Sequence, residues 1–109
     1  MKFSWAVYLD SAPRESDRWA ASDRGWCHCR IPGIDQGDDG FGSECVGNYV
    51  KYGPPFHDKI HFHACAYYHE VAGGMLHNHS LGYAEFNTAE EARTWIESRI
   101  TERFESPVH

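Results

Sequence analysis

IHFHACAYYHEV, residues 60–71, is the stretch of the sequence that decides the fold. Successive side chains of a β-strand point to opposite faces. One face of this strand would be apolar and would carry Ile60, Phe62, Ala64, Ala66 and Tyr68. The other face would carry His61, His63, Cys65, Tyr67 and His69. The alternation therefore predicts a strand with one face in the core and one face of groups that can bind a metal ion or carry protons.

The residues after this run predict a β-hairpin. Gly73 and Gly74 suit a tight turn, and a return strand follows from Leu76 to Phe86. A two-residue turn would place His77 opposite Glu70. The same register would pair His79 with Tyr68, whereas a three-residue turn would pair it with His69. Histidines would then gather at both ends of the hairpin, namely His69, His77 and His79 near the turn, and His57, His61 and His63 at the other end.

Three shorter strands are expected before the central run. The segment Lys2–Leu9 alternates in the same way, and Glu44–Tyr52 is a second candidate. Between them, Trp26–Ile31 would place Cys27 and Cys29 on one face and His28 on the other. Prolines end two of these strands, because proline cannot continue a sheet ladder; they are Pro32, Pro54 and Pro55.

The last expected element is an amphipathic helix over Ala89–Phe104. Thr88 as N-cap and Glu91 three residues later are typical of a capping box. The helix has one apolar stripe, formed by Ala92, Ile96, Ile100 and Phe104 with Ala89 and Trp95 beside them. Strands followed by one long helix predict an α+β fold, an antiparallel sheet of four to five strands with the C-terminal helix packed on one face. The His row would emerge on the opposite face.

The composition predicts one folded domain over residues 1–109. A chain of 109 residues can bury one core but not two, and an aromatic content of 15% argues against disorder. The net charge of −6 argues against general affinity for nucleic acid or for an anionic membrane. Neither an apolar run of about 20 residues nor a signal peptide is recognisable, so we expect a cytoplasmic protein. Its cysteines would be reduced thiols or metal ligands.

The segment 14–30 interleaves arginines and tryptophans, a pattern that can contact phosphates or stacked bases. These residues are Arg14, Arg18, Arg24 and Arg30 with Trp19 and Trp26. Acidic neighbours nearly cancel the positive charge, namely Glu15, Asp17 and Asp23. We therefore expect a solvated loop, and no direct binding of nucleic acid.

Histidines and cysteines supply two candidate zinc sites. His61 and His63 would lie about 6.6 Å apart on one strand face, close enough to share one ion. His57 would be a third ligand if the segment after Pro55 folds back. The alternative is a closed structural site, formed by Cys27, Cys29 and Cys45 with a histidine. Without a metal ion the His row is a polar and aromatic contact surface, which is the interpretation that the sequence favours.

An acidic, glycine-rich loop is expected over Gly33–Ser43. It contains Asp35, Asp38 and Asp39, and Glu44 follows it directly. Such a loop can dock on a basic partner. The sequence has no nucleophile elbow, phosphate loop or dinucleotide fingerprint, so we assign no catalytic residue.

The return strand leads into the expected helix through a strand-to-helix segment, FNTAEEARTWI at residues 86–96. In this segment, its small size, its acidity and its lack of catalytic motifs, the chain resembles small phage-encoded inhibitors of bacterial defence, the anti-CRISPR type. The resemblance is one of general type and assigns no residue. It implies a protein in the host cytoplasm that binds a CRISPR effector complex or a similar nuclease and blocks nucleic-acid entry or nuclease recruitment.

Two functions therefore remain open. The first is a non-catalytic interaction protein that binds a partner through the acidic loop and the His-rich sheet face, with Tyr67 and His69 among the contact residues. A homodimer through the sheet edge or the same face is also compatible with the sequence. The second is a small protein that binds zinc or another transition metal, either for structure or for hydrolysis.

Overall fold

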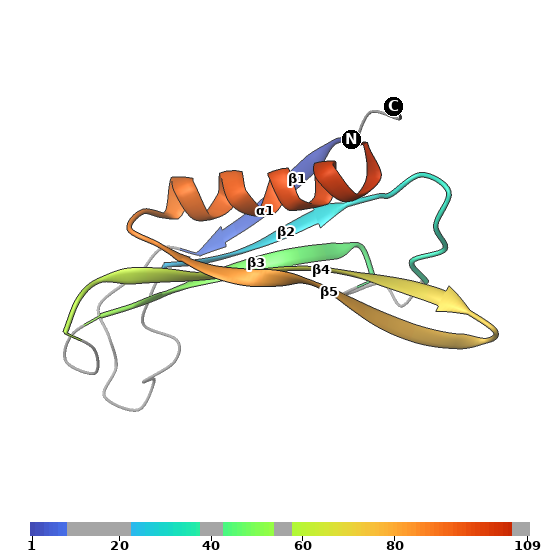
Figure 1. Ribbon diagram of the computed structural model, residues 1–109, viewed down its shortest axis with the longest axis horizontal. Helices are drawn as coiled ribbons and strands as arrows, with labels where there is room; N and C mark the ends of the chain where they lie inside the picture. Colours follow the sequence, from blue (N-terminus) through green and yellow to red (C-terminus); the bar gives the residue numbers. More distant parts are fainter. Residues whose placement is uncertain (9–22, 38–42, 54–57, 106–109) are drawn as a thin grey trace.

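The computed structural model describes residues 1–8, 23–37, 43–53 and 58–105, and in these residues it contains five strands and one helix (Figure 1). The elements are β1 Phe3–Tyr8, β2 Arg24–Cys29, β3 Cys45–Tyr52, β4 His61–Ala72, β5 Met75–Phe86 and α1 Ala89–Phe104. All five strands belong to one antiparallel sheet, and α1 packs on it. The predicted α+β fold is confirmed, and the helix has the predicted bounds.

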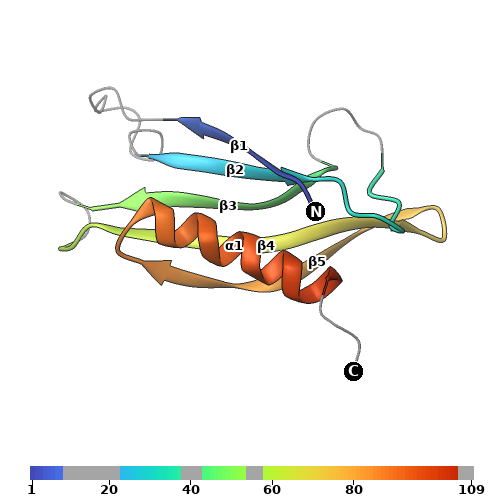
Figure 2. The same cartoon turned by 90° about the horizontal axis from the view of Figure 1, so that it is seen from above.

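The sheet is a meander, in which each strand pairs with the next one in the chain. Its strand order is β1-β2-β3-β4-β5 (Figure 2). The turn between β4 and β5 contains two residues, Gly73 and Gly74, whose φ angles of 62° and 76° only glycine adopts readily. His77 therefore pairs with Glu70, and His79 with Tyr68. The two-residue alternative for this hairpin is confirmed.

Helix α1 covers one face of the sheet, over β3, β4 and β5 (Figures 1 and 2). Its side chains Ala92, Ile96 and Ile100 are completely buried, as the apolar stripe predicts. The apolar face of β4 lies beneath them, with Phe62, Ala64, Ala66 and Tyr68 all buried. A Cβ atom on Gly47 of β3 would lie 2.6 Å from Ile96 Cγ2, so the close approach of α1 requires a glycine there.

The ends of α1 are satisfied locally. The Thr88 hydroxyl oxygen accepts a hydrogen bond from the backbone N–H of Glu91 at 3.1 Å, so the predicted N-cap is present. At the other end, the backbone N–H of Glu105 donates to the Thr101 carbonyl at 2.7 Å. None of the helical residues that the structure describes forms a segment with the length and apolarity that crossing a bilayer requires.

Candidate functional site on the open face of the sheet

The strand residues that point away from α1 form a second surface, which we call the open face. Most of its side chains are half-buried or exposed, including Trp26, His28, Asn48, Val50, Tyr52, His61, His63, Cys65, Tyr67, His69, Tyr83 and Glu85. Tyr83 is 74% exposed. The described strand residues of this face include one guanidinium, that of Arg24, and one carboxylate, that of Glu85. A solvated sheet face normally carries more charge, so this surface differs from the polar face expected of an antiparallel sheet in water.

Three potential metal ligands meet at one point of the open face. They are His61 and His63 of β4 and Glu85 of β5, and one ligand atom from each lies within 4.8 Å of the other two. His63 Nε2 is 3.0 Å from Glu85 Oε1. The imidazole rings of His61 and His63 have centroids 5.0 Å apart. The prediction that these two histidines can share one ion is thus geometrically supported, and the third residue near them is a carboxylate.

The position of Glu85 depends on a β-bulge. Near the hairpin turn, Tyr67 pairs with Ser80, but beyond the bulge Cys65 pairs with Tyr83, so β5 holds one extra residue. Gly82 lies in this bulge with φ of 107°, a conformation that other residues rarely adopt. The extra residue reverses the side-chain alternation of β5 relative to β4. Glu85 therefore lies opposite His63 and points to the open face.

Helix α1 holds the bulge in place from the other side of the sheet. The guanidinium of Arg99 donates two hydrogen bonds to the Leu81 carbonyl, from Nε at 3.1 Å and from Nη2 at 2.9 Å. The backbone N–H of Gly82 donates to Ser80 Oγ at 3.3 Å. These bonds satisfy backbone groups that the bulge removes from the regular ladder.

Tyr67 and His69 lie farther along the same face and have internal partners. The Tyr67 hydroxyl donates to Asn48 Oδ1 at 3.2 Å and is 3.2 Å from Cys45 Sγ. Burial, reinforced by the hydrogen bond with Cys45, raises the pKa of Tyr67 above its ordinary value. His69 Nδ1 donates to Asn78 Oδ1. Both predicted contact residues are therefore held in fixed orientations on the open face.

The histidines near the hairpin turn do not form one cluster. His69 points to the open face, whereas His77 and His79 point to the other face, because they pair with Glu70 and Tyr68. His79 Nε2 is 3.1 Å from Glu70 Oε1, and its ring stacks on Tyr68 with the centroids 4.5 Å apart. All three histidines lie near the turn, as predicted. His69 is on the opposite face from His77 and His79, because it neighbours Glu70 and Tyr68 along β4 and side chains alternate between faces, so the three do not form one ligand group.

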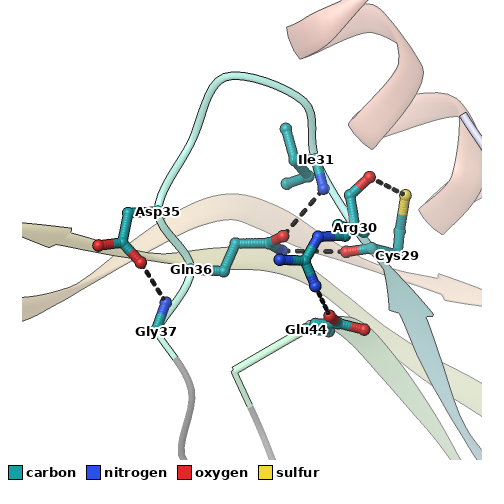
Figure 3. Close-up of polar contacts among 7 residues, drawn as sticks. All are labelled: Cys29, Arg30, Ile31, Asp35, Gln36, Gly37 and Glu44. Carbon is teal, nitrogen blue, oxygen red and sulfur yellow. Dashed lines mark hydrogen bonds and ion pairs between the residues drawn. The ribbon is translucent and has the colours of Figure 1, made fainter.

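The described part of the acidic loop is anchored to the sheet (Figure 3). The buried side chain of Gln36 accepts a hydrogen bond from Ile31 N at 2.9 Å and donates one to Cys29 O at 3.0 Å. Asp35 is exposed and accepts from Gly37 N at 3.0 Å.

The charges of this loop are only partly balanced. Glu44 Oε1 forms an ion pair with Arg30 Nη1 at 2.9 Å. Figure 3 shows that Asp35 lies apart from this pair. The other two predicted acidic residues, Asp38 and Asp39, lie outside the described residues.

The cysteine site is not assembled in this structure. Cys27 and Cys29 are buried in the core, on the face that the strand alternation predicts, whereas Cys45 pairs with His28 and contacts Tyr67 on the open face. Burial raises the pKa of both the Cys27 and the Cys29 thiols, which disfavours the thiolate that binds zinc. Within the residues that the structure describes, His61, His63 and Glu85 are the one group of three close ligands. His57, the third ligand expected from the sequence, lies outside them.

Sequence reasoning missed Glu85, although one signal could have revealed it. An unbroken register after the Gly73–Gly74 turn would place Ala84 opposite His63. An isolated glycine inside a strand often marks a bulge, and Gly82 stands in the return strand. Shifting the register by one residue at that glycine brings Glu85 to the position opposite His63.

The arginine and tryptophan segment is described only at its C-terminal end. The Arg24 guanidinium lies 5.3 Å from the centre of the Trp26 ring, a cation–π distance. Arg14, Arg18 and Trp19 lie outside the described residues.

Comparison of the chain with protein-family models, with curated proteins and with solved structures finds no match.

Proposed function

We propose that this chain is a non-catalytic interaction protein whose open face binds a macromolecular partner. The observation that carries the proposal is the composition of that face, which combines aromatic and histidine side chains with one guanidinium and one carboxylate. The buried centres of protein interfaces are depleted in charge and enriched in aromatic residues. Tyr83, on the edge strand β5, is the aromatic residue that we propose as an anchor, because it is 74% exposed on the open face.

The partner that we propose is a nucleic-acid-handling complex of the kind bound by anti-CRISPR-type inhibitors. The net charge of −6 favours association with a basic surface, and a surface that binds nucleic acid is basic. By occupying that surface, the protein would exclude nucleic acid through its volume and its charge. Direct binding of nucleic acid by this chain is not part of the proposal.

In this proposed function, the acidic loop attracts the partner at long range, and the open face forms the contact area. The exposed Asp35, with Asp38 and Asp39, supplies long-range attraction, while the ion pair with Arg30 reduces the contribution of Glu44. Tyr67 and His69 form part of the contact area, and their hydrogen bonds fix the shape that the partner meets. Fixed side chains lose less entropy on binding than mobile ones.

The proposal is tested with a panel of purified CRISPR effector complexes, by measuring binding of the chain and its competition with target DNA. Tyr83→Arg adds a charge on β5, the edge strand of the open face, and removes its exposed aromatic ring. We expect this substitution to abolish binding, because the new charge would be desolvated without a partner. Ser98→Arg adds the same charge on the exposed side of α1 and should leave binding unchanged.

The possible results separate the parts of the proposal. Failure of every effector to bind would contradict the anti-CRISPR assignment, and full binding by Tyr83→Arg would contradict the open face as the interface. Replacing Asp35, Asp38 and Asp39 together with Asn should slow association and reduce its salt dependence. Sedimentation of the isolated chain detects the competing occupant of this face, a second copy of the protein.

A further inference from the structure

We propose that His61, His63 and Glu85 form a binding site for one zinc-class divalent ion on the open face. The inference is independent of the proposed partner, since it concerns the isolated chain. Zinc ligands at about 2.0–2.1 Å in a tetrahedral arrangement are separated from one another by roughly 3.4 Å. His63 Nε2 and Glu85 Oε1 are already 3.0 Å apart, and all three ligand atoms lie within 4.8 Å of one another. Small side-chain rotations would complete the geometry.

The strands beneath these ligands form a rigid support. His63 and Glu85 are direct cross-strand partners, and His61 is the next residue on the same face of β4. The ladder between β4 and β5 extends on both sides of the bulge, from Phe62–Phe86 to Ala72–Met75. Sites held by regular strands keep their ligands in place more accurately than sites on loops.

Neighbouring groups orient both imidazoles. His61 Nδ1 donates a hydrogen bond to the Lys59 carbonyl at 2.9 Å, so the lone pair of this ring is on Nε2. Metal-binding histidines commonly donate their other ring N–H to a carbonyl in this way. The Tyr52 ring stacks on His61 at 5.7 Å and meets His63 edge-on at 4.9 Å. The two rings are thus held before any ion binds.

The donor set selects the class of ion. Two imidazole nitrogens and one carboxylate oxygen suit zinc, cobalt or nickel, whereas calcium and magnesium prefer oxygen ligands alone. Three protein ligands leave a fourth position, and the side chains of His63 and Glu85 are 38% and 58% exposed. The fourth position is therefore accessible to water or to a donor group of a bound partner, as in zinc sites that are not closed by protein.

The chain contains a matched control for this site. His79 and Glu70 also form a cross-strand histidine–carboxylate pair, at 3.1 Å, but they lie on the other face of the hairpin. Among the described residues no third ligand atom completes a group with them. Substitutions at this pair change the same residue types without touching the proposed site.

The test is zinc binding to untagged, EDTA-treated wild-type protein, measured by competition with a chromophoric chelator, together with the visible spectrum of the cobalt-loaded protein. We expect one equivalent to bind. His63→Ala and Glu85→Gln should each weaken zinc binding by at least about tenfold, the lower bound for loss of even an outer-shell group. His79→Ala and Glu70→Gln should bind zinc as tightly as the wild type.

The inference would be overturned if the wild type bound no zinc, or if zinc binding survived both His63→Ala and Glu85→Gln. A cobalt spectrum with thiolate charge-transfer bands would also overturn it, because such bands would place the ion at cysteines. Should a variant not fold, NMR of the wild-type imidazoles decides the question. Zinc should shift the ring signals of His61 and His63 and leave those of His77 and His79 in place; the reverse pattern would refute the site.

Discussion

Replacing Cys27 with alanine should make this protein more stable than the wild type at high pH. The Cys27 side chain of β2 is completely buried in the core, on the face of the sheet that α1 packs on, and this burial raises the pKa of its thiol. The unfolded chain has an ordinary thiol pKa of about 8.5. When folding raises the pKa of a thiol, its contribution to the free energy of unfolding is fully present below the unfolded pKa. That contribution is lost as the pH rises toward the native pKa, because the unfolded chain releases the proton while the native chain keeps it. Cys27 should therefore destabilise the native state under alkaline conditions.

The size of the effect follows from linkage. Each pH unit between the unfolded and the native pKa lowers the free energy of unfolding by about 1.4 kcal/mol for one proton. Between pH 8.5 and 10.5 the loss through Cys27 is about 2.7 kcal/mol if its native pKa lies above that interval. Deleting one buried heavy atom costs about 1 kcal/mol at neutral pH, as in Ile→Val replacements. Cys27→Ala should thus be less stable than the wild type at pH 7.5 and more stable by roughly 1.5 kcal/mol at pH 10.5.

Urea denaturation followed by tryptophan fluorescence, at each pH and with a phosphine reductant, measures both curves. Ile96→Val is the matched control, because it removes one buried methyl group from the same core but no titrating group. Its stability should stay below that of the wild type by the same amount at every pH. If the Cys27→Ala and wild-type curves are also parallel, the thiol is not held neutral by burial and the reasoning fails.

Three further substitutions test how α1 is attached to the sheet, each by urea denaturation at pH 7.5. Thr88→Ala removes the N-cap hydrogen bond to Glu91 and should cost about 1 kcal/mol, most of which Thr88→Asn should restore. Ile96→Ala leaves a cavity under the helix and should cost about 2–5 kcal/mol; a loss below 1 kcal/mol would mean that α1 contributes little to the core. Gly47→Ala would place its Cβ 2.6 Å from both the Cys65 carbonyl oxygen and Ile96 Cγ2, and should cost at least about 1–3 kcal/mol. An unchanged midpoint for that variant would contradict the close packing of β3 against α1.

The elements of the fold were predictable because each has a local cause. Alternation in residues 60–71 identified β4 and its two faces. The pair Gly73–Gly74 predicted a hairpin, and the structure has the register of its two-residue turn. Thr88 and the apolar stripe defined α1 with its observed bounds. Cys27 and Cys29 were placed together on one strand face, and both are buried. These inferences need only nearest neighbours in the chain.

The candidate site was only half predictable because it depends on pairing between strands. Local alternation placed His61 and His63 on one face, but which residue of β5 lies opposite depends on the register. The β2–β3 ladder has a second irregularity, between Cys27 and His28, which also separates Cys45 from the other cysteines. The composition of a strand does not reveal where such a shift falls, unless an isolated glycine such as Gly82 marks it.

The bulge at Gly82 links the two proposals made for the open face. Without the extra residue, the alternation of β5 beyond this point would reverse, and both Tyr83 and Glu85 would point toward α1. Loss of the bulge would therefore remove the proposed anchor of the interface and the proposed third metal ligand together. Glu85→Gln separates them, because it keeps the shape of the side chain and the register while it removes the carboxylate charge. Loss of zinc binding with retained partner binding in that variant would mean that the partner does not need the bound ion, whereas loss of both would mean that the partner contacts the Glu85 carboxylate or the ion that it holds.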